Sequence, residues 1–111
     1  MMSLFNNNQF DDFKPEFLSN FPVVLVEFFA DWNGSCQIMS PILKDIKSQF
    51  NGELKICRVN IEVEKKLTEN YKITKTPAYL IFHKGKITDR IDGIVPRKTL
   101  LNKLKILVRN N

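Results

Sequence analysis

Cys36 is the residue whose type and position first indicate chemistry in this chain. An apolar run that only Glu27 interrupts, Val23 to Phe29, precedes it, and a turn of polar and small residues, Asp31 to Ser35, lies between. Apolar residues at helical spacing follow Cys36. A thiol in the first turn of a helix lies near free backbone N–H groups and the positive end of the helix dipole, which favour the thiolate. The sequence therefore predicts a strand, a turn and a helix that begins near one thiol.

The composition is that of a single globular domain, residues 1–111. Hydrophobic residues make up 43% of the chain, and its nine Phe argue against disorder over most of its length. The longest apolar run is far shorter than the roughly 20 residues of a membrane span, and the first residues lack the pattern of a secretory signal. Two cysteines in a short chain without such a signal favour a reducing compartment. We therefore expect a cytoplasmic protein that does not enter a membrane.

The net charge of +5 is compatible with an anionic partner. However, the Lys residues are scattered, no block of five like charges occurs, and the aromatic residues fall in apparent strands. We therefore expect no nucleic-acid binding. A role as an accessory subunit whose basic helices face an acidic partner remains an open alternative.

Hydrophobic periodicity predicts alternating strands and helices. Val23–Phe29 is apolar on both of its alternating faces, as in a central strand that is covered on both sides. Residues 1–9 are expected to fray or to form a short edge strand at Ser3–Phe5. The order of elements implies parallel strands with crossover helices, then an antiparallel hairpin and a closing helix, which is an α/β fold. The predicted helices are Phe10–Leu18, Gln37–Phe50, Ile61–Tyr71 and Pro96–Val108, and the other predicted strands are Leu54–Asn60, Ala78–Phe82 and Ile87–Ile91.

Several short motifs follow one another on these elements. They are VVLVEFFADW on the first strand, Pro41 inside the next helix, RVNIE at the end of the second strand, the pair Thr76-Pro77, and Gly93 after the last strand. With these motifs the chain resembles the thioredoxin family from about Phe10 to Leu107. The resemblance implies a thioredoxin fold, with a central mixed sheet of four or five strands flanked by helices on both faces, and no cofactor. It also implies that the proline is cis, faces the active-site turn and follows a residue whose backbone hydrogen-bonds a bound peptide.

One motif departs from the family pattern. The family's active site has the sequence W-C-G-P-C, whereas this chain has Trp32-Asn33-Gly34-Ser35-Cys36. In the dithiol cycle one thiolate attacks a substrate disulfide and the second thiol resolves the mixed disulfide, so both sulfurs are needed. The family consists of protein-disulfide oxidoreductases, but with Asn33 at the attacking position we expect no dithiol reductase activity from this motif.

Cys36 and Asn33 each leave two interpretations open. In the family the matching cysteine is the inner, largely buried one, so Cys36 is either a structural thiol of low reactivity or a functional monothiol that forms mixed disulfides. Asn is among the best helix N-caps, so Asn33 is expected to accept a hydrogen bond from the backbone N–H of Ser35 or Cys36. This position would then have exchanged a nucleophile for a cap.

Glu27 interrupts an apolar strand, so it either lies near solvent or is buried with a partner. The resemblance places at this position a buried acid that exchanges protons with the inner cysteine, and it places a basic residue at Arg58. We therefore expect a partly buried Glu27–Arg58 pair beneath Cys36, with a structural role favoured over proton transfer. Strand alternation puts Cys57 on the face opposite Arg58, where it should be a buried core residue.

The expected partner is a protein or peptide, bound at the Trp32 and Pro77 surface. A monothiol activity through Cys36 is the alternative function. We expect a monomer, and no metal site, because two Cys and one His do not make one. The resemblance implies a binding surface formed by Trp32, Gly34, Ser35, Thr76, Pro77, Gly93 and Ile94.

Overall fold

The computed structural model describes residues 10–110, so the predicted strand at Ser3–Phe5 lies outside the described residues. Among residues 10–110, no helix has both the length and the apolar composition needed to cross a membrane. In chain order the elements are β1 (Asp11–Asp12), α1 (Phe17–Asn20), β2 (Val23–Phe29), α2 (Gly34–Lys47), β3 (Leu54–Asn60), α3 (Lys65–Asn70), β4 (Ala78–His83), β5 (Lys86–Asp92) and α4 (Arg97–Arg109).

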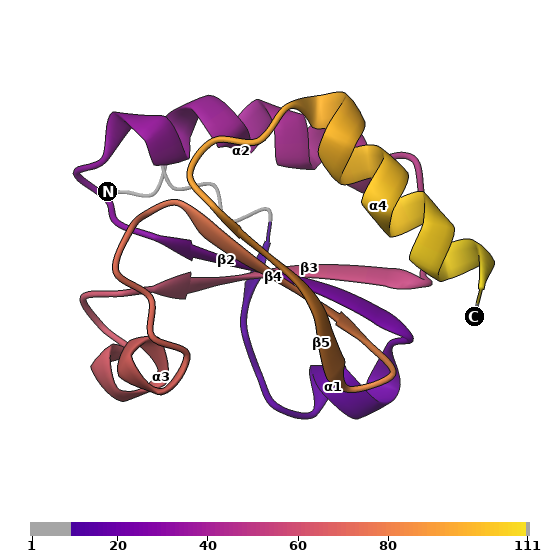
Figure 1. Cartoon of the computed structure of the whole chain (residues 1–111), viewed down its shortest axis with the longest axis horizontal. Helices are drawn as coiled ribbons and strands as arrows, with labels where there is room; N and C mark the ends of the chain where they lie inside the picture. The colour runs from indigo at the N-terminus through magenta and orange to yellow at the C-terminus, as the bar shows by residue number, and fades with distance from the viewer. Residues whose placement is uncertain (1–9, 111) are drawn as a thin grey trace.

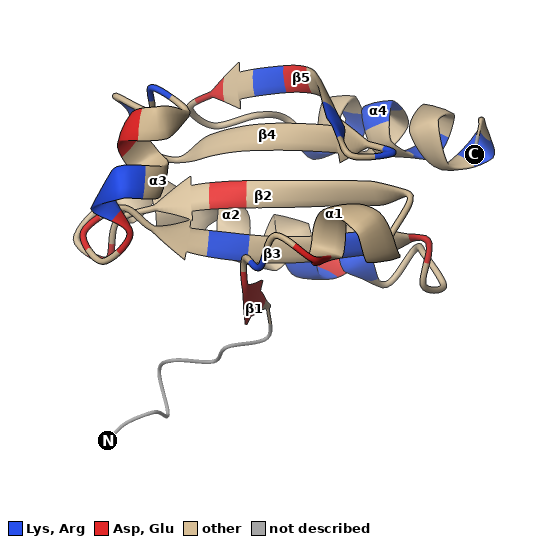
Figure 2. Cartoon of the chain, turned by 90° about the horizontal axis from the view of Figure 1, so that it is seen from below, with Lys and Arg blue, Asp and Glu red and all other residues tan. Residues whose placement is uncertain are grey.

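The strands form one mixed sheet in the order β1-β3-β2-β4-β5. β2 pairs with β3 in parallel and with β4 antiparallel, and β4 and β5 form an antiparallel hairpin. Figure 1 shows α2 and α4 on one face of this sheet and α1 and α3 on the other, and Figure 2 shows the strands in this order from below. The expected α/β fold, a mixed sheet with helices on both faces, is confirmed.

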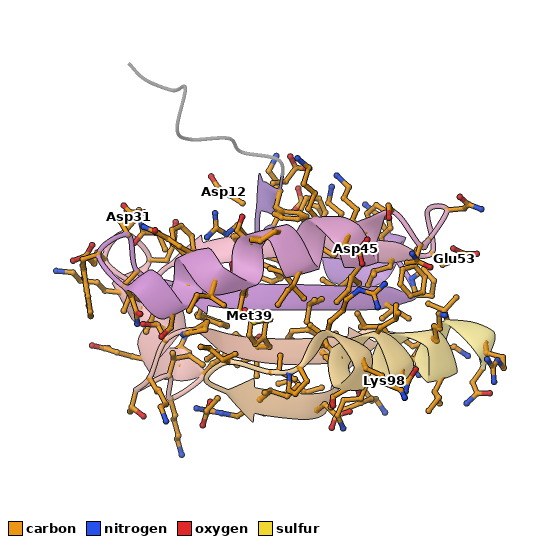
Figure 3. All side chains as sticks on the ribbon, turned by 90° about the horizontal axis from the view of Figure 1, so that it is seen from above. Asp12, Asp31, Met39, Asp45, Glu53 and Lys98 are labelled. Carbon is orange, nitrogen blue, oxygen red and sulfur yellow. The ribbon has the colours of Figure 1, made fainter. Side chains whose placement is uncertain are left out.

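Two hydrophobic cores lie on the two faces of the sheet because successive residues of a strand point to opposite sides. Leu25 of β2 packs with Met39 of α2 and Leu104 of α4 in the first core, and Figure 3 shows Met39 beneath α2. Val26, the next residue of β2, packs with Cys57 in the second core, against which Leu67 of α3 also packs. β2 is therefore buried on both faces, as its apolar run predicts.

The predicted helix Phe10–Leu18 is wrong over most of its length. Asp11 and Asp12 instead pair in parallel with Cys57 and Arg58 at the edge of β3, so their backbone is extended. The Phe13 N–H then bonds the Arg58 carbonyl at 2.9 Å, and only Phe17–Asn20 is helical. Pairing with a distant strand thus overrides the local helical pattern.

Other boundaries shift by a few residues for local reasons. α3 starts at Lys65 rather than Ile61, because the Asn60 carbonyl accepts the N–H groups of Val63 and Glu64 in a preceding turn. α2 starts three residues earlier than predicted and ends at Lys47. The hairpin turn has two central residues, Lys84 and Gly85, both with positive φ, which is the geometry of a type I′ turn.

Candidate functional site

The site lies where β2 ends and the chain turns into α2. Asn33 precedes the first residue of the helix in an extended conformation, with φ −97° and ψ 114°, as an N-cap residue does. Its N–H bonds the Ala30 carbonyl at 3.2 Å, and its own carbonyl accepts the Cys36 N–H at 3.1 Å. The turn therefore holds Cys36 in the first turn of α2.

The Asn33 side chain uses both of its polar atoms. Its Oδ1 accepts the Ser35 backbone N–H at 2.8 Å, which is the predicted N-cap bond. Its Nδ2 donates to the Thr76 carbonyl at 2.8 Å and to Thr76 Oγ1 at 2.9 Å. These two bonds to Thr76 were not predicted. We call the three bonds together the Asn33 clamp, since they hold the start of α2 against the loop that precedes β4.

The same loop connects to a third segment. The Thr76–Pro77 peptide bond is cis, and the Pro77 carbonyl accepts the Gly93 N–H at 2.7 Å. Gly93 has a φ of 92°, a conformation that glycine adopts without strain. The clamp and this bond therefore bring three separate loops together: the Trp32 turn, the Thr76-Pro77 loop and the segment that follows β5.

Cys36 is only 3% exposed. Burial raises the pKa of the Cys36 thiol above its usual value, and the negative charge of Glu27 acts in the same direction. Hydrogen bonds with the Ala30 backbone and the Thr76 side chain, together with the positive charge of Arg58, oppose this rise in pKa. The thiol therefore has little access to solvent and a low thiolate fraction at neutral pH.

The predicted Glu27–Arg58 pair is present, and it has a third member. Arg58 Nε donates to Glu27 Oε1 at 2.9 Å, and the Tyr79 hydroxyl donates to Oε2 at 2.7 Å. Burial raises the pKa of Glu27, an effect that the Arg58 charge and these hydrogen bonds oppose. Burial and the Glu27 charge also raise the pKa of Tyr79, so its hydroxyl stays protonated and remains a donor. The arrangement satisfies a carboxylate that is only 1% exposed.

Cys57 lies on the other face of the sheet from Glu27 and Arg58, as strand alternation predicts. It is fully buried in the second core, and its thiol lies 3.7 Å from the Leu25 carbonyl. Burial raises the pKa of Cys57 to about 12. Because the sheet separates the two thiols, Cys57 does not supply the sulfur that position 33 lacks.

Exposed apolar side chains lie on the connected loops. Trp32 is 70% exposed, and Ile94, which follows Gly93, is 51% exposed. Trp32 Nε1 donates to Glu62 Oε2 at 3.3 Å, a contact that places the carboxylate beside the indole. Ile38 is 54% exposed on α2, one helical turn after Gly34. The sequence analysis identified neither Ile38 nor Glu62 as part of this surface, because the exposure of Ile38 and the contact of Glu62 with Trp32 appear only in the folded structure.

A groove of about 570 Å³ lies beside β3. It is lined by Asp12 and the segment that follows it, by residues of α3, and by Arg58. The guanidinium of Arg58 lies 3.8 Å from the centroid of the Phe29 ring, which also lines the groove. Arg58 therefore contacts Glu27 on one side and this groove on the other.

The sheet order, the β2–α2 turn and the adjoining cis proline define a protein of the thioredoxin-fold class. A mutant thioredoxin from Halobacterium salinarum has a similar structure, with a TM-score of 0.80 at 20% identity over 89% of this chain and 88% of that one. The thioredoxin family model matches residues 4–106.

Two cyanobacterial proteins are similar in sequence over most of their length. Thioredoxin 1 of a Nostoc species is 34% identical over 93 residues, which cover 84% of this chain and 87% of that protein. Thioredoxin 1 of Synechococcus elongatus is 35% identical over 92 residues, covering 83% and 86%. This chain belongs to the thioredoxin family.

Proposed function

We propose that this protein binds a peptide or protein segment at the surface formed by Trp32, the Thr76-Pro77 loop and Ile94, and that it has no dithiol reductase activity. The observation that carries this proposal is the Asn33 clamp. At the position of the family's attacking thiol stands an amide whose donors and acceptor are already engaged within the protein.

The chemistry of disulfide reduction supports the second half of the proposal. A thiolate must attack the substrate disulfide, and a second thiol must then displace the product from the mixed disulfide. Asn33 has no sulfur, and Cys57 is buried in the core on the opposite face of the sheet. Cys36 therefore has no intramolecular partner with which to complete the cycle.

The surface itself supports peptide binding. Trp32 and Ile94 are large apolar side chains that are more than half exposed, and aromatic residues of this kind are frequent anchors at interfaces. Asn33 occupies one acceptor position of the Thr76 carbonyl, and a carbonyl oxygen has a second lone pair for a peptide N–H. Binding therefore does not require the clamp to open.

The catalytic half of the proposal can be tested by insulin reduction with dithiothreitol. The wild-type protein should reduce insulin no faster than dithiothreitol alone, whereas Asn33→Cys should restore a dithiol and accelerate the reaction. Cys36→Ser in the Asn33→Cys background is the matched control and should abolish the gain. Turnover by the wild-type protein above background, lost in Cys36→Ser, would overturn the proposal.

The binding half can be tested without any thiol chemistry. Trp32 is the only Trp of the chain, so its fluorescence reports contacts at this surface. The probe is S-carboxymethylated insulin B chain, an extended peptide that cannot form a disulfide. Burying Ile94 is worth about 1.5–3 kcal/mol, so Ile94→Asp should weaken binding about tenfold or more. Ile87, 47% exposed on β5, provides the control substitution Ile87→Asp, which should leave binding unchanged. Absence of binding, or equal losses in both variants, would contradict this half.

A monothiol activity of Cys36 is the alternative, favoured by its place in the first turn of α2, where the helix dipole stabilises a thiolate. In this reaction the Cys36 thiolate attacks oxidised glutathione, forms a protein–glutathione disulfide and releases one glutathione thiolate. Mass spectrometry should detect this adduct in the folded protein if the alternative holds. The burial of Cys36 and its raised pKa instead favour the absence of this glutathione adduct.

A further inference from the structure

The positive charge of the molecule is concentrated on the two helices that cover one face of the sheet. α2 and α4 contain seven of the seventeen Lys and Arg residues and one of the twelve Asp and Glu residues. Their net charge is therefore +6, whereas the rest of the chain, with ten basic and eleven acidic residues, has a net charge of −1. Figure 1 shows the two helices side by side, and Figure 2 shows basic segments along α4. The net charge of +5 thus resides on this helix layer.

Four exposed residues of α4 form one stripe along the helix: Lys98, Asn102, Lys105 and Arg109. Their spacings of four, three and four residues place them on the same side of a helix. At a rise of about 1.5 Å per residue the stripe is about 16 Å long. The other side of α4 packs into the first core through Leu100, Leu101 and Leu104.

The charges of this stripe are not neutralised within the described part of the protein. Arg97, at the start of α4, pairs with Asp45 of α2, and Lys103 pairs with Asp89 of β5 at 3.4 Å. In contrast, none of the three basic residues of the stripe forms an ion pair with any carboxylate of residues 10–110. Figure 3 shows Lys98 well separated from Asp45. The stripe is therefore available to a partner.

We propose that this stripe, together with Ile106 beside it, binds an acidic polypeptide segment of a partner protein. Ile106 follows Lys105 and is 53% exposed, so the surface combines positive charge with one apolar side chain. A segment that carries several Asp or Glu residues around one apolar residue complements both features. The proposal does not rest on the function proposed for the Trp32 surface, since the two surfaces share no residue.

The composition of the face favours a polypeptide over the other anionic partners. A helix that inserts into a membrane interface needs a broad exposed apolar face, but the apolar face of α4 is buried in the core, which leaves Ile106 alone. Proteins that bind single-stranded nucleic acid combine basic residues with aromatic side chains for base stacking. α4 contains no aromatic residue, and phosphate contacts alone make no use of Ile106.

The experiment uses an array of 15-residue peptides, each with four Asp or Glu residues at varied spacing and with or without one central Leu. Peptides that bind the full-length protein are then titrated in solution by fluorescence anisotropy. The triple variant Lys98→Glu, Lys105→Glu and Arg109→Glu should weaken binding at least tenfold, because three favourable charge pairs become unfavourable. A charge-matched control reverses three exposed lysines elsewhere: Lys14, Lys65 and Lys86.

Ile106→Ser should remove the preference for peptides that contain Leu while leaving the dependence of binding on salt unchanged. Circular dichroism confirms that each variant folds. The proposal fails if no acidic peptide binds, if the control triple variant loses as much affinity as the α4 variant, or if the wild-type protein binds a 20-base-pair DNA duplex or phosphatidylserine vesicles more tightly than any peptide.

Discussion

Replacing Asn33 with Ser separates the two parts of the Asn33 clamp. Ser is about as good an N-cap as Asn, so the bond to the Ser35 N–H should be kept. The two bonds from Asn33 Nδ2 to Thr76, at 2.8 and 2.9 Å, are lost. At about 0.5–1.5 kcal/mol net per hydrogen bond, Asn33→Ser should lower the free energy of unfolding by about 1–3 kcal/mol.

Asn33→Ala removes the cap as well and should lower the free energy of unfolding by about 1 kcal/mol more than Asn33→Ser. Urea unfolding followed by circular dichroism measures both losses, with unchanged m-values expected, because the surface exposed on unfolding is the same. Asn102→Ser is the matched control, since Asn102 is exposed in the middle of α4, and it should change stability by less than about 0.5 kcal/mol.

The outcome for Asn33→Ser decides whether the clamp stabilises the fold. If Asn33→Ser is as stable as the wild-type protein while Asn33→Ala is not, only the cap matters and the bonds to Thr76 contribute nothing. A double-mutant cycle with Thr76→Val isolates the bond to Thr76 Oγ1 and should give a coupling energy of about 0.5–1.5 kcal/mol. A coupling energy near zero would show that the bond to Thr76 Oγ1 does not stabilise the fold.

Two further predictions concern titrating groups. Because the pKa of folded Glu27 lies above its usual 4.5, its contribution to stability is fully present below pH 4.5 and is lost as the pH rises through the folded-state pKa. The wild-type protein should therefore lose stability relative to Glu27→Gln as the pH rises above about 4.5, and parallel urea-unfolding profiles would contradict this. Burial raises the pKa of the Cys36 thiol above its usual value and that of Cys57 to about 12, so iodoacetamide should label Cys36 first, at a rate that keeps rising with pH through the weakly alkaline range. Mass spectrometry measures both rates, and a plateau below about pH 8 would show that the Cys36 thiolate is stabilised instead.

Features that depend on local sequence were predictable. β2 and β3 have the predicted bounds because their apolar patterns are continuous between turn signals. The bond from the Ser35 N–H to Asn33 was also predictable, since an N-cap contacts residues two or three positions away. The series of motifs from VVLVEFFADW to Gly93 was sufficient to indicate the fold class.

Features that depend on pairing between distant segments were not predictable from periodicity. The Asn33–Thr76 bonds join residues 43 positions apart, and the Tyr79–Glu27 bond joins residues 52 apart. Both contacts require the register of β4 against β2 to be known. The β1 strand escaped prediction for the same reason, because Asp11 is a favourable helix-capping residue and only its pairing with β3 makes it extended.

The polar contacts of Glu27 also bear on how the sheet selects one alignment of its strands. Arg58 of β3 and Tyr79 of β4 lie directly opposite Glu27 of β2, so the three residues form a row across the middle of an otherwise apolar sheet. If β4 slipped by one residue, Tyr79 would point to the other face and Glu27 would lose one of its two hydrogen-bond partners inside the core. Burying a carboxylate with an unsatisfied oxygen is strongly unfavourable. The row therefore favours one register of β4 against β2, a structural role for Glu27 that does not depend on proton transfer.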